Sequence, residues 1–438
     1  MCSSDLEEVT SMLKTLFYYF LWGKREKVKR KSINRKRKDG GLSMVDLEKY
    51  FMALKAAWVS RLQNTKGKWA DIFKFYVNKT LLPLEYWWKT NFRKSDSFPI
   101  VTKLPAFYQD VILAFNNAKY ITPQYLLNKH DIVQQPIWGN EYFKINNSCL
   151  YLKNFIESRI LYVKDLINNN GNIMNDHELY NCMQSKQDYL RSVYIVKNHV
   201  IKKIVQFDVN IAPYVKITDM RYIMHNNRRS LIEACKSKFY YEILCGKEQC
   251  RGSMESVYAR EFSFENNKQI WHNIFMQKVL LKIPKLNEFN FKILNNIVPC
   301  GNVLYKWQKS ISKHCDFCNN IETTKHMLYE CERVCNIWKD ISSSVNVNIT
   351  WKHIVCGFPS YEPSTKIQSI NYMISIVTYA IFKENSYCKF KELKYGQVNL
   401  KAVVKQNIMY YDIVLKNVDP KIQIAVLCKC VCEKLDSP

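Results

Sequence analysis

Residues 315–331, with the sequence CDFCNNIETTKHMLYEC, place three cysteines and one histidine within a short segment. The pattern is Cys-x2-Cys-x7-His-x4-Cys, and its members are Cys315, Cys318, His326 and Cys331. A Cys-x2-Cys pair lets a tight turn direct two sulfurs at one ion, and a following His and Cys can complete a tetrahedron. Three thiolates and one imidazole favour zinc over hard cations such as Mg²⁺. The spacing therefore predicts a structural zinc knuckle, with no open position for a catalytic water.

Two alternatives stand beside this prediction. The chain has 16 cysteines, so the pattern can arise by chance, with the thiols buried as small hydrophobic side chains. The polar segment NNIETT at 319–324 favours zinc, because an exposed turn of this kind needs another source of order. His314 and Cys335 are rival ligands. His314 directly precedes the first cysteine and would strain the turn, whereas Cys335 lies one helical turn after Cys331 and is a credible substitute.

Composition sets the fold class. In 438 residues, 47% are apolar, 14% are aromatic and only 11 are glycine, and apolar residues recur at helical spacing. We therefore expect a mainly α fold of several small helical subdomains with one CCHC zinc knuckle. The longest apolar run, INYMISIVTYAIF at 370–382, is shorter than the roughly 20 residues of a membrane-spanning helix and predicts a buried core helix. The scattered cysteines and the lack of a signal-peptide pattern indicate a reducing compartment and a protein that is not secreted.

Changes in composition divide the chain into five segments. We expect a basic arm with an amphipathic helix at 1–65, an aromatic-rich irregular helical region at 66–145 and a basic helical linker region at 146–270. A zinc-binding domain follows at 271–345, and a helical extension at 346–438. In the zinc-binding domain, we expect two helices, a break at Pro299, Cys300 and Gly301, a short third helix and then the first cysteine pair.

The net charge of +26 points to a polyanionic partner, and nucleic acid is the leading candidate. The charge is densest in residues 24–38, which we call the basic arm. Glu26 is its only acidic residue, and its candidate nucleic-acid-binding residues are Lys24, Arg25, Lys27, Lys29, Arg30, Lys31, Arg35, Lys36, Arg37 and Lys38. Such density predicts an extended segment or a loop, because like charges repel. The arm can bind phosphates, serve as a nuclear localisation signal or form a solvated loop.

Aromatic residues near the basic runs offer a second kind of contact. Tyr18, Trp22 and Trp307 can stack on unpaired bases. At helical spacing, however, aromatic residues more often belong to a core.

Two blocks of sequence carry a family resemblance. Residues 289–338 resemble the zinc-binding domain near the C-terminus of LINE-type (non-LTR) retrotransposon reverse transcriptases. The matching positions are Pro299, Leu304, Trp307, Cys315, Cys318, Glu322, His326, Cys331 and Trp338. The segment FLWGKREKVKRKSINRKRKDGGLSMVDLEKYFMALKAAWVSRL at 20–62 is similar to the segment after the polymerase thumb of that family. Residues 156–179 are similar to its linker region.

The resemblance implies function. It implies a nucleic-acid-binding C-terminal portion of a retrotransposon replicase, which grips template RNA or target DNA for target-primed reverse transcription. The sequence contains no Asp-Asp pair, the element that a polymerase needs to hold its two metal ions, so we expect no enzymatic activity. The expected partners are RNA, DNA and the replicase's catalytic portion, in the nucleus or in a cytoplasmic ribonucleoprotein and without a membrane. The alternative is a zinc-stapled protein-interaction module or a degenerate retroelement fragment.

Overall fold

The computed structural model divides the chain into two compact units. Unit 1 comprises residues 1–21 and 46–249, and unit 2 comprises residues 22–45 and 250–438. The structure describes residues 3–23, 26–64, 67–92, 98–119, 132–205, 222–225, 228–246, 252–279, 281–310, 312–358, 364–391, 399–419 and 424–436. The basic arm thus belongs to the same unit as the zinc-binding segment. The finer division into five segments stays a prediction.

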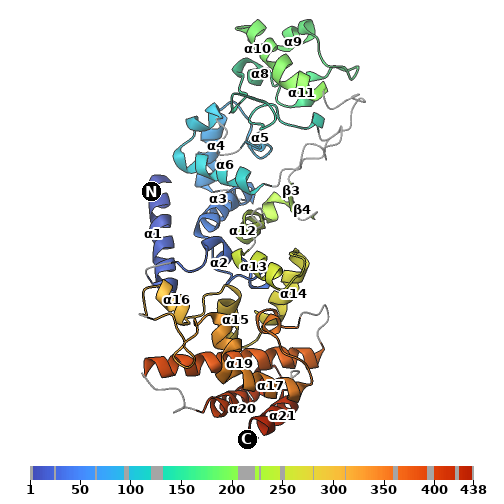
Figure 1. The fold of residues 1–438 in the computed structure, drawn as a ribbon. Coiled ribbons are helices and arrows are strands. Elements are labelled where there is room, and N and C mark those ends of the chain that lie inside the picture. The colour runs from blue at the N-terminus through green and yellow to red at the C-terminus, as the bar shows by residue number, and fades with distance from the viewer. Residues whose placement is uncertain are drawn as a thin grey trace. The chain divides into compact units, whose positions relative to one another are not determined.

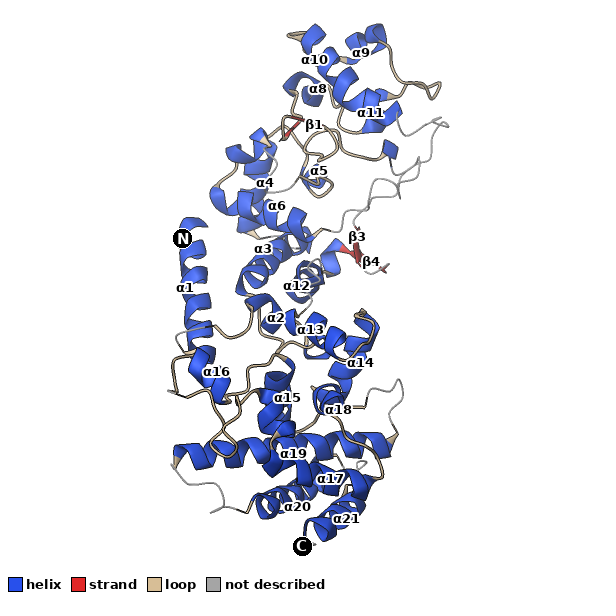
Figure 2. Ribbon diagram, in the orientation of Figure 1, coloured by secondary structure: helices blue, strands red, loops and turns tan. Residues whose placement is uncertain are grey.

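Unit 1 is built from short helices and two small hairpins (Figures 1 and 2). Its α-helices are α1 (Ser3–Trp22, whose last residue falls in unit 2), α3 (Leu47–Asn64), α4 (Lys68–Asn78), α5 (Leu84–Trp87), α6 (Ala106–Ala118), α8 (Lys153–Glu157), α9 (Asp176–Cys182), α10 (Tyr189–Val196), α11 (Lys202–Val205) and α12 (Ser237–Gly246). Single turns of other helix types are η2 (Pro99–Lys103), η4 (Val163–Leu166), η5 (Lys197–Ile201) and η6 (Ile232–Ala234). The antiparallel hairpins pair β1 (Lys144–Ile145) with β2 (Ser148–Cys149), and β3 (Tyr222–His225) with β4 (Arg228–Leu231).

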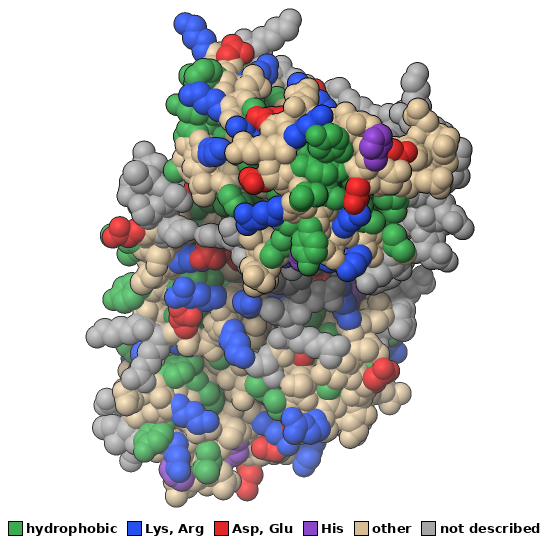
Figure 3. Space-filling view, turned by 90° about the horizontal axis from the view of Figure 1, so that it is seen from above, with side chains coloured by type: hydrophobic (Ala, Val, Ile, Leu, Met, Phe, Trp, Pro, Cys, Tyr) green, Lys and Arg blue, Asp and Glu red, His purple; other side chains and the backbone are tan. Residues whose placement is uncertain are grey.

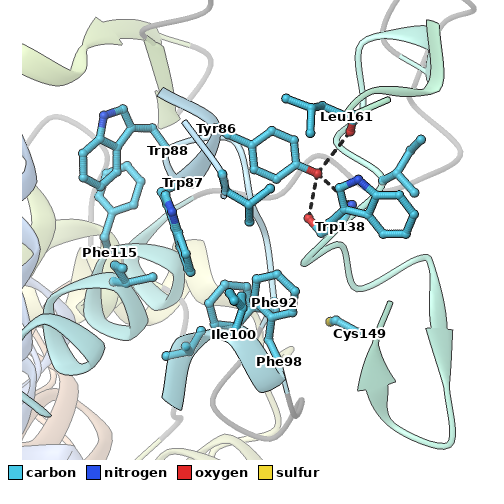
Figure 4. Close-up of a cluster of buried hydrophobic side chains, with 14 of the residues drawn as sticks. Tyr86, Trp87, Trp88, Phe92, Phe98, Ile100, Phe115, Trp138, Cys149 and Leu161 are labelled. Atoms are coloured by element: carbon cyan, nitrogen blue, oxygen red, sulfur yellow. Dashed lines mark hydrogen bonds between the residues drawn. The ribbon is translucent and has the colours of Figure 1, made fainter. Parts of the chain in front are cut away.

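The aromatic-rich region forms the core of unit 1. Tyr86, Trp87 and Trp138 are fully buried, and Figure 4 shows them with the rings around them. The Tyr86 hydroxyl accepts a hydrogen bond from the Trp138 backbone N–H at 2.7 Å, and lies 3.1 Å from the Leu161 carbonyl oxygen. A buried hydroxyl needs such partners, because water no longer solvates it. The Tyr86 side chain thereby holds the irregular backbone at Trp138 and Leu161 in place.

Unit 2 contains the predicted zinc-binding domain and the C-terminal helices. It comprises α2 (Arg30–Asn34), η1 (Arg37–Asp39), α13 (Ser253–Glu261), α14 (Lys268–Lys278), α15 (Pro284–Leu294), α16 (Gly301–Lys306), η7 (His326–Glu330), α17 (Glu332–Val345), α18 (Trp351–Cys356), α19 (Thr365–Phe390), α20 (Leu400–Val418) and α21 (Ala425–Asp436). Helices α14 and α15, the break at Pro299 and short α16 occur in the predicted order. Helices dominate both units, and this confirms the mainly α fold class.

Helix α19 lies in the core of unit 2. Its apolar segment 370–382 is buried except for the half-buried Tyr379 and Phe382, and the helix packs against α15 and α20 (Figure 1). The run INYMISIVTYAIF therefore forms the core helix that its length predicted. None of the helices in the described ranges combines the length and apolar character that a membrane crossing requires.

The basic arm is neither extended nor a free loop in its described part. Ile33 is fully buried, and its carbonyl oxygen accepts a hydrogen bond from the Leu42 N–H at 2.9 Å. Gly40 has a positive φ of 79° and packs so tightly on the Phe275 ring that a Cβ atom would clash with it. Burial of one apolar residue and this glycine turn fix the arm on α14, which offsets the repulsion between its charges.

The start of α3 differs in detail from the sequence pattern. Ser43 followed by Asp46 is a pattern similar to a capping box, but Ser43 Oγ accepts a hydrogen bond from the Arg37 N–H at 3.0 Å, inside the arm. Asp46 alone caps the helix, through Oδ1 and the Lys49 N–H at 3.3 Å. The serine instead stabilises the turn that closes the arm.

Lys278 on α14 is a fully buried cation, and we expect it to make stability depend on pH. Burial lowers the pKa of Lys278 to about 7 from 10.5 in an exposed lysine. Between pH 7 and 10.5 the unfolded chain therefore binds more protons, so the free energy of unfolding should rise with pH across this window. The full shift corresponds to roughly 5 kcal/mol. Chemical denaturation of unit 2 at several pH values measures the slope.

Lys278→Met should reduce that slope and stabilise the protein at pH 7, because a buried cation is replaced by an apolar chain of similar length. The remaining slope is expected from Lys119 in unit 1, whose pKa burial also lowers to about 7. Lys285→Met, at an exposed position of α15, is the control. A slope as steep in Lys278→Met as in the unaltered chain would assign the pH dependence to other groups.

Candidate functional site

The structure brings the four predicted ligands together. One ligand atom each from Cys315, Cys318, His326 and Cys331 lies within 4.8 Å of all the others. Cys318 Sγ and His326 Nε2 are 3.2 Å apart. Zinc bonds of about 2.3 Å to sulfur and 2.0 Å to nitrogen in a tetrahedron imply an S···N separation of about 3.6 Å. The cluster is therefore compatible with zinc, and His326 would bind it through Nε2.

Local backbone geometry creates this cluster. The Cys315 N–H donates to the Asn320 carbonyl at 2.7 Å, and the Asn319 N–H donates to the Cys315 carbonyl at 2.9 Å. Asn319 has a positive φ of 56°, which asparagine tolerates better than most residues. This turn carries both Cys315 and Cys318. The other two ligands flank η7, a turn of π-helix, in which the Cys331 N–H donates to the His326 carbonyl at 2.9 Å.

Burial gives the cluster its electrostatic character. Cys315, His326 and Cys331 are each at most 6% exposed. A hydrogen bond from the Cys331 thiol lowers the pKa of Cys315, and the same bond together with burial raises the pKa of Cys331. Without a cation, therefore, two negatively charged thiolates side by side are disfavoured at this pair of cysteines. A divalent ion would remove this repulsion, which is the chemistry of a structural zinc site.

The rival ligands have other partners. The Cys335 thiol lies 3.5 Å from the carbonyl oxygens of Tyr329 and Glu330, as a donor to the preceding helical turn. His314 Nδ1 is 2.9 Å from the Asn319 carbonyl oxygen. Neither residue belongs to the group of four. The structure thus favours the first ligand set over both substitutes, while zinc binding by these residues stays a prediction.

Glu322 connects the cluster to the rest of unit 2. It lies in the polar spacer between Cys318 and His326 and is only 1% exposed. Its carboxylate accepts hydrogen bonds from the Gly301 N–H at the start of α16, from Asn385 Nδ2 at 3.0 Å and from Lys389 Nζ. A buried carboxylate needs such partners to remain ionised. The spacer is thus ordered by a buried ion pair to α19 in addition to any metal.

The basic arm contributes residues in different environments. Lys24 and Arg25 lie outside the described residues. The side chains that are exposed are Lys29, Arg30, Lys31, Lys36, Arg37 and Lys38, whereas Lys27 and Arg35 are half-buried. Arg30 forms an ion pair with Glu26. The six exposed side chains can contact an anionic partner, and nucleic-acid binding by the arm stays a prediction.

Arg35 fixes the arm to α13 and α14. Its Nη1 donates to Glu255 Oε1 at 2.6 Å, and its guanidinium lies 5.7 Å from the centre of the Phe275 ring. Glu255 Oε1 also accepts the Gly252 N–H at 2.9 Å and caps α13. The ion pair is largely buried, with side-chain exposures of 15% and 8%. Arg35 is therefore built into the packing of unit 2.

Lys27 lies against an aromatic residue of the zinc-binding segment. Its Nζ is 4.0 Å from the centre of the Trp307 ring and 5.8 Å from that of Trp22. Tyr18, by contrast, is buried at 6% exposure. Burial, and then the neighbouring Lys309 and Lys292, lower the pKa of Lys27. Lys27 thus lies over the half-buried Trp307 ring and near two further lysines.

Positive charge alone does not mark a binding face. In the view of Figure 3, Lys and Arg side chains are scattered among acidic and hydrophobic ones. At the contact of the arm with Trp307, a lysine of the arm lies over an aromatic ring of the zinc-binding segment. Similar cation–ring contacts occur elsewhere, for example between Lys186 and Tyr180.

One family comparison bears on this site. Residues 253–338 match the family described as zinc-binding in reverse transcriptase. The match runs from the first residue of α13 to Trp338 in α17 and contains all four clustered residues. This part of unit 2 is therefore similar to the zinc-binding region of reverse transcriptases, and its four clustered residues are compatible with zinc. No curated protein matches the chain.

Sequence reasoning missed two of the contacts that hold this region. Glu322 was singled out as part of the spacer, but its partner Lys389 lies in the C-terminal extension. Arg35 was grouped with the phosphate-binding residues, but its closest partner is Glu255. A Gly-Gly pair directly after a basic run was the available signal that the arm turns back on itself.

Proposed function

We propose that this chain is the nucleic-acid-binding C-terminal portion of a LINE-type retrotransposon reverse transcriptase. In this proposal it grips template RNA or target DNA for target-primed reverse transcription, and a separate catalytic portion carries out the polymerisation. One observation carries the proposal: the basic arm is fixed onto the same unit as the zinc-binding region, with Lys27 against Trp307. Because the arm is anchored at Ile33, Arg35 and Gly40, its exposed cations stand on a segment that is fixed to unit 2.

The anchoring has a physical consequence for binding. A free basic tail loses conformational entropy when it binds a polyanion. Arg35, Ile33 and Gly40 already hold this arm in place, so less entropy is lost. Contacts from lysine and arginine to phosphates carry no sequence information, and binding should be non-specific and strongly dependent on salt.

Neutralising three exposed arm residues tests the proposal. Lys36→Gln, Arg37→Gln and Lys38→Gln together should weaken binding of structured RNA, single-stranded DNA and duplex DNA. They should also flatten the dependence of log affinity on log salt by about two units, because each lost phosphate contact removes about 0.7 to 0.9. Fluorescence anisotropy across a salt series measures both effects. The preferred nucleic acid then shows which strand the chain holds.

A matched variant controls for total charge. Lys285→Gln, Lys366→Gln and Lys429→Gln remove the same charge from exposed positions of unit 2 outside the arm. This triple variant should keep most of the salt dependence. Equal effects of the two triples would show that only net charge matters. Failure of the unaltered chain to bind any of the three nucleic acids would favour the protein-interaction module.

A further inference from the structure

A polar cavity lies in unit 2 beside the candidate metal centre. Its volume is about 310 Å³, near the lower end of the range of about 300–1,000 Å³ for ligand sites. The start of the basic arm, α16 and the spacer of the metal cluster all contribute to its wall. We call it the arm pocket, and its lining includes Lys27, Asn296, Asn302, Lys306, Trp307 and Thr324.

The lining has the chemistry of a site for a planar polar anion. Amides and a hydroxyl from Asn296, Asn302 and Thr324 can hydrogen bond to a ring edge, whereas Trp307 supplies an aromatic surface. Lys27 and Lys306 supply positive charge. The described residues that line the pocket include no carboxylate. The nearby Glu322 carboxylate, which accepts the Gly301 N–H, is paired with Lys389.

Lys27 and Trp307 are arranged so that a ligand can replace their contact. The Lys27 ammonium lies 4.0 Å from the centre of the indole ring, and it stands on a flexible four-carbon chain. If it moved to a phosphate at the pocket entrance, the ring surface would be free for a base. Nearby Lys309 and Lys292 repel Lys27, and a phosphate would relieve this repulsion.

We propose that the arm pocket binds one unpaired nucleotide of a single-stranded nucleic acid. The phosphate lies at Lys27 and Lys306, and the base lies beside Trp307 and the Asn302 amide. This inference rests on the proposed function and adds a preference for unpaired strands. In a duplex, the bases are paired and stacked and cannot enter a pocket without being extruded. Stacking on an aromatic ring accepts any base, so the pocket need not read sequence.

The pocket wall is connected to the metal cluster. Thr324 Oγ1 donates to Asn296 Oδ1 at 3.0 Å, and Thr323 Oγ1 accepts the His326 N–H at 3.0 Å. Two successive threonines therefore join the pocket to a candidate zinc ligand. A spacer that is ordered therefore also orders the pocket wall. In this proposal, zinc bound at the candidate metal centre would help the pocket to hold a strand.

Asn302→Leu tests the pocket without changing charge. Asn302 is half-buried on α16, and leucine favours helix while filling the cavity. Affinity should be measured by anisotropy for a labelled single strand of about twelve nucleotides, as DNA and as RNA, and for the matching duplex. We expect about a tenfold loss for single strands. Duplex affinity and the slope against salt should stay unchanged.

Controls separate this inference from the proposed function. Asn273→Leu, at a half-buried position of α14 outside the pocket lining, should have no effect. Trp307→Leu is a second variant, and bound zinc and thermal unfolding report whether each variant folds. Equal losses for single strands and duplex, or no loss in either variant, would overturn the pocket but leave the arm's binding intact. No binding by the unaltered chain would overturn both.

Discussion

Replacing Cys315 and Cys318 with serine should reduce bound zinc from about one ion per chain to none and melt the segment from α16 to α17. The two cysteines share one turn, so their loss removes half of the tetrahedron. Small structural zinc sites contribute on the order of 10 kcal/mol to folding, because the site exists only in the folded chain. Zinc should be quantified on the purified protein by elemental analysis.

Loss of order should be visible at Trp338. Its indole N–H donates to the Leu328 carbonyl of η7 at 2.8 Å, and the side chain is buried at 3% exposure. Hydrogen exchange of residues 315–338 should therefore accelerate strongly in the double variant, whereas exchange in unit 1 should not. A chelator added to the unaltered chain should produce the same pattern.

Cys335→Ser is the matched control. Cys335 is a neighbouring cysteine whose thiol contacts helix carbonyls outside the cluster. It should retain full zinc. Zinc content that is unchanged in the Cys315 and Cys318 variant, or lost in Cys335→Ser, would overturn the ligand assignment.

Short-range patterns in the sequence predicted the local structure well. The Cys-x2-Cys spacing lies within one turn, and the order of α14, α15 and α16 follows from apolar periodicity and Pro299. Asn175 with Glu178 three residues later also predicts a capped helix, and α9 begins there, with Asn175 Oδ1 accepting the Glu178 N–H at 2.9 Å. Each of these depends on residues a few positions apart, whose interactions are fixed by helix and turn geometry.

Long-range ion pairs escaped prediction for the opposite reason. Arg35 and Glu255 are 220 residues apart, and Glu322 and Lys389 are 67 apart. Periodicity shows which face of a helix is buried, but it does not show which acidic and basic side chains will form ion pairs. The positive charges of the basic arm repel one another, as expected. The packing of Ile33 and Gly40 offsets this repulsion, and a count of charges does not reveal such packing.

Glu322→Gln should destabilise unit 2 by about 3 kcal/mol, since breaking a buried ion pair leaves its partner uncompensated. The Lys389 side chain is only 24% exposed, so water can solvate the orphaned ammonium only in part. The glutamine oxygen can still accept the Gly301 N–H, but its amide group cannot satisfy Lys389 Nζ. Chemical denaturation of unit 2 measures the loss.

The same substitution should weaken zinc binding by about a hundredfold, because metal binding and folding of the spacer are coupled. Competition with a chelator measures the affinity. Glu288→Gln is the matched control, since Glu288 pairs with Lys292 at 2.7 Å on the exposed face of α15. It should cost less than about 0.5 kcal/mol and leave zinc affinity unchanged.

A double-mutant cycle shows whether the ion pair itself is responsible. Lys389→Met removes the cation, so Glu322→Gln made in that background should cost at least about 1 kcal/mol less than in the unaltered chain. Equal costs in both backgrounds would assign the effect of Glu322 to its hydrogen bonds with Gly301 and Asn385. A smaller cost in the Lys389→Met background would show that α19 stabilises the zinc knuckle through this ion pair, although α19 lies outside the matched region 253–338. The zinc-binding region would then depend for its stability on a helix from the C-terminal extension.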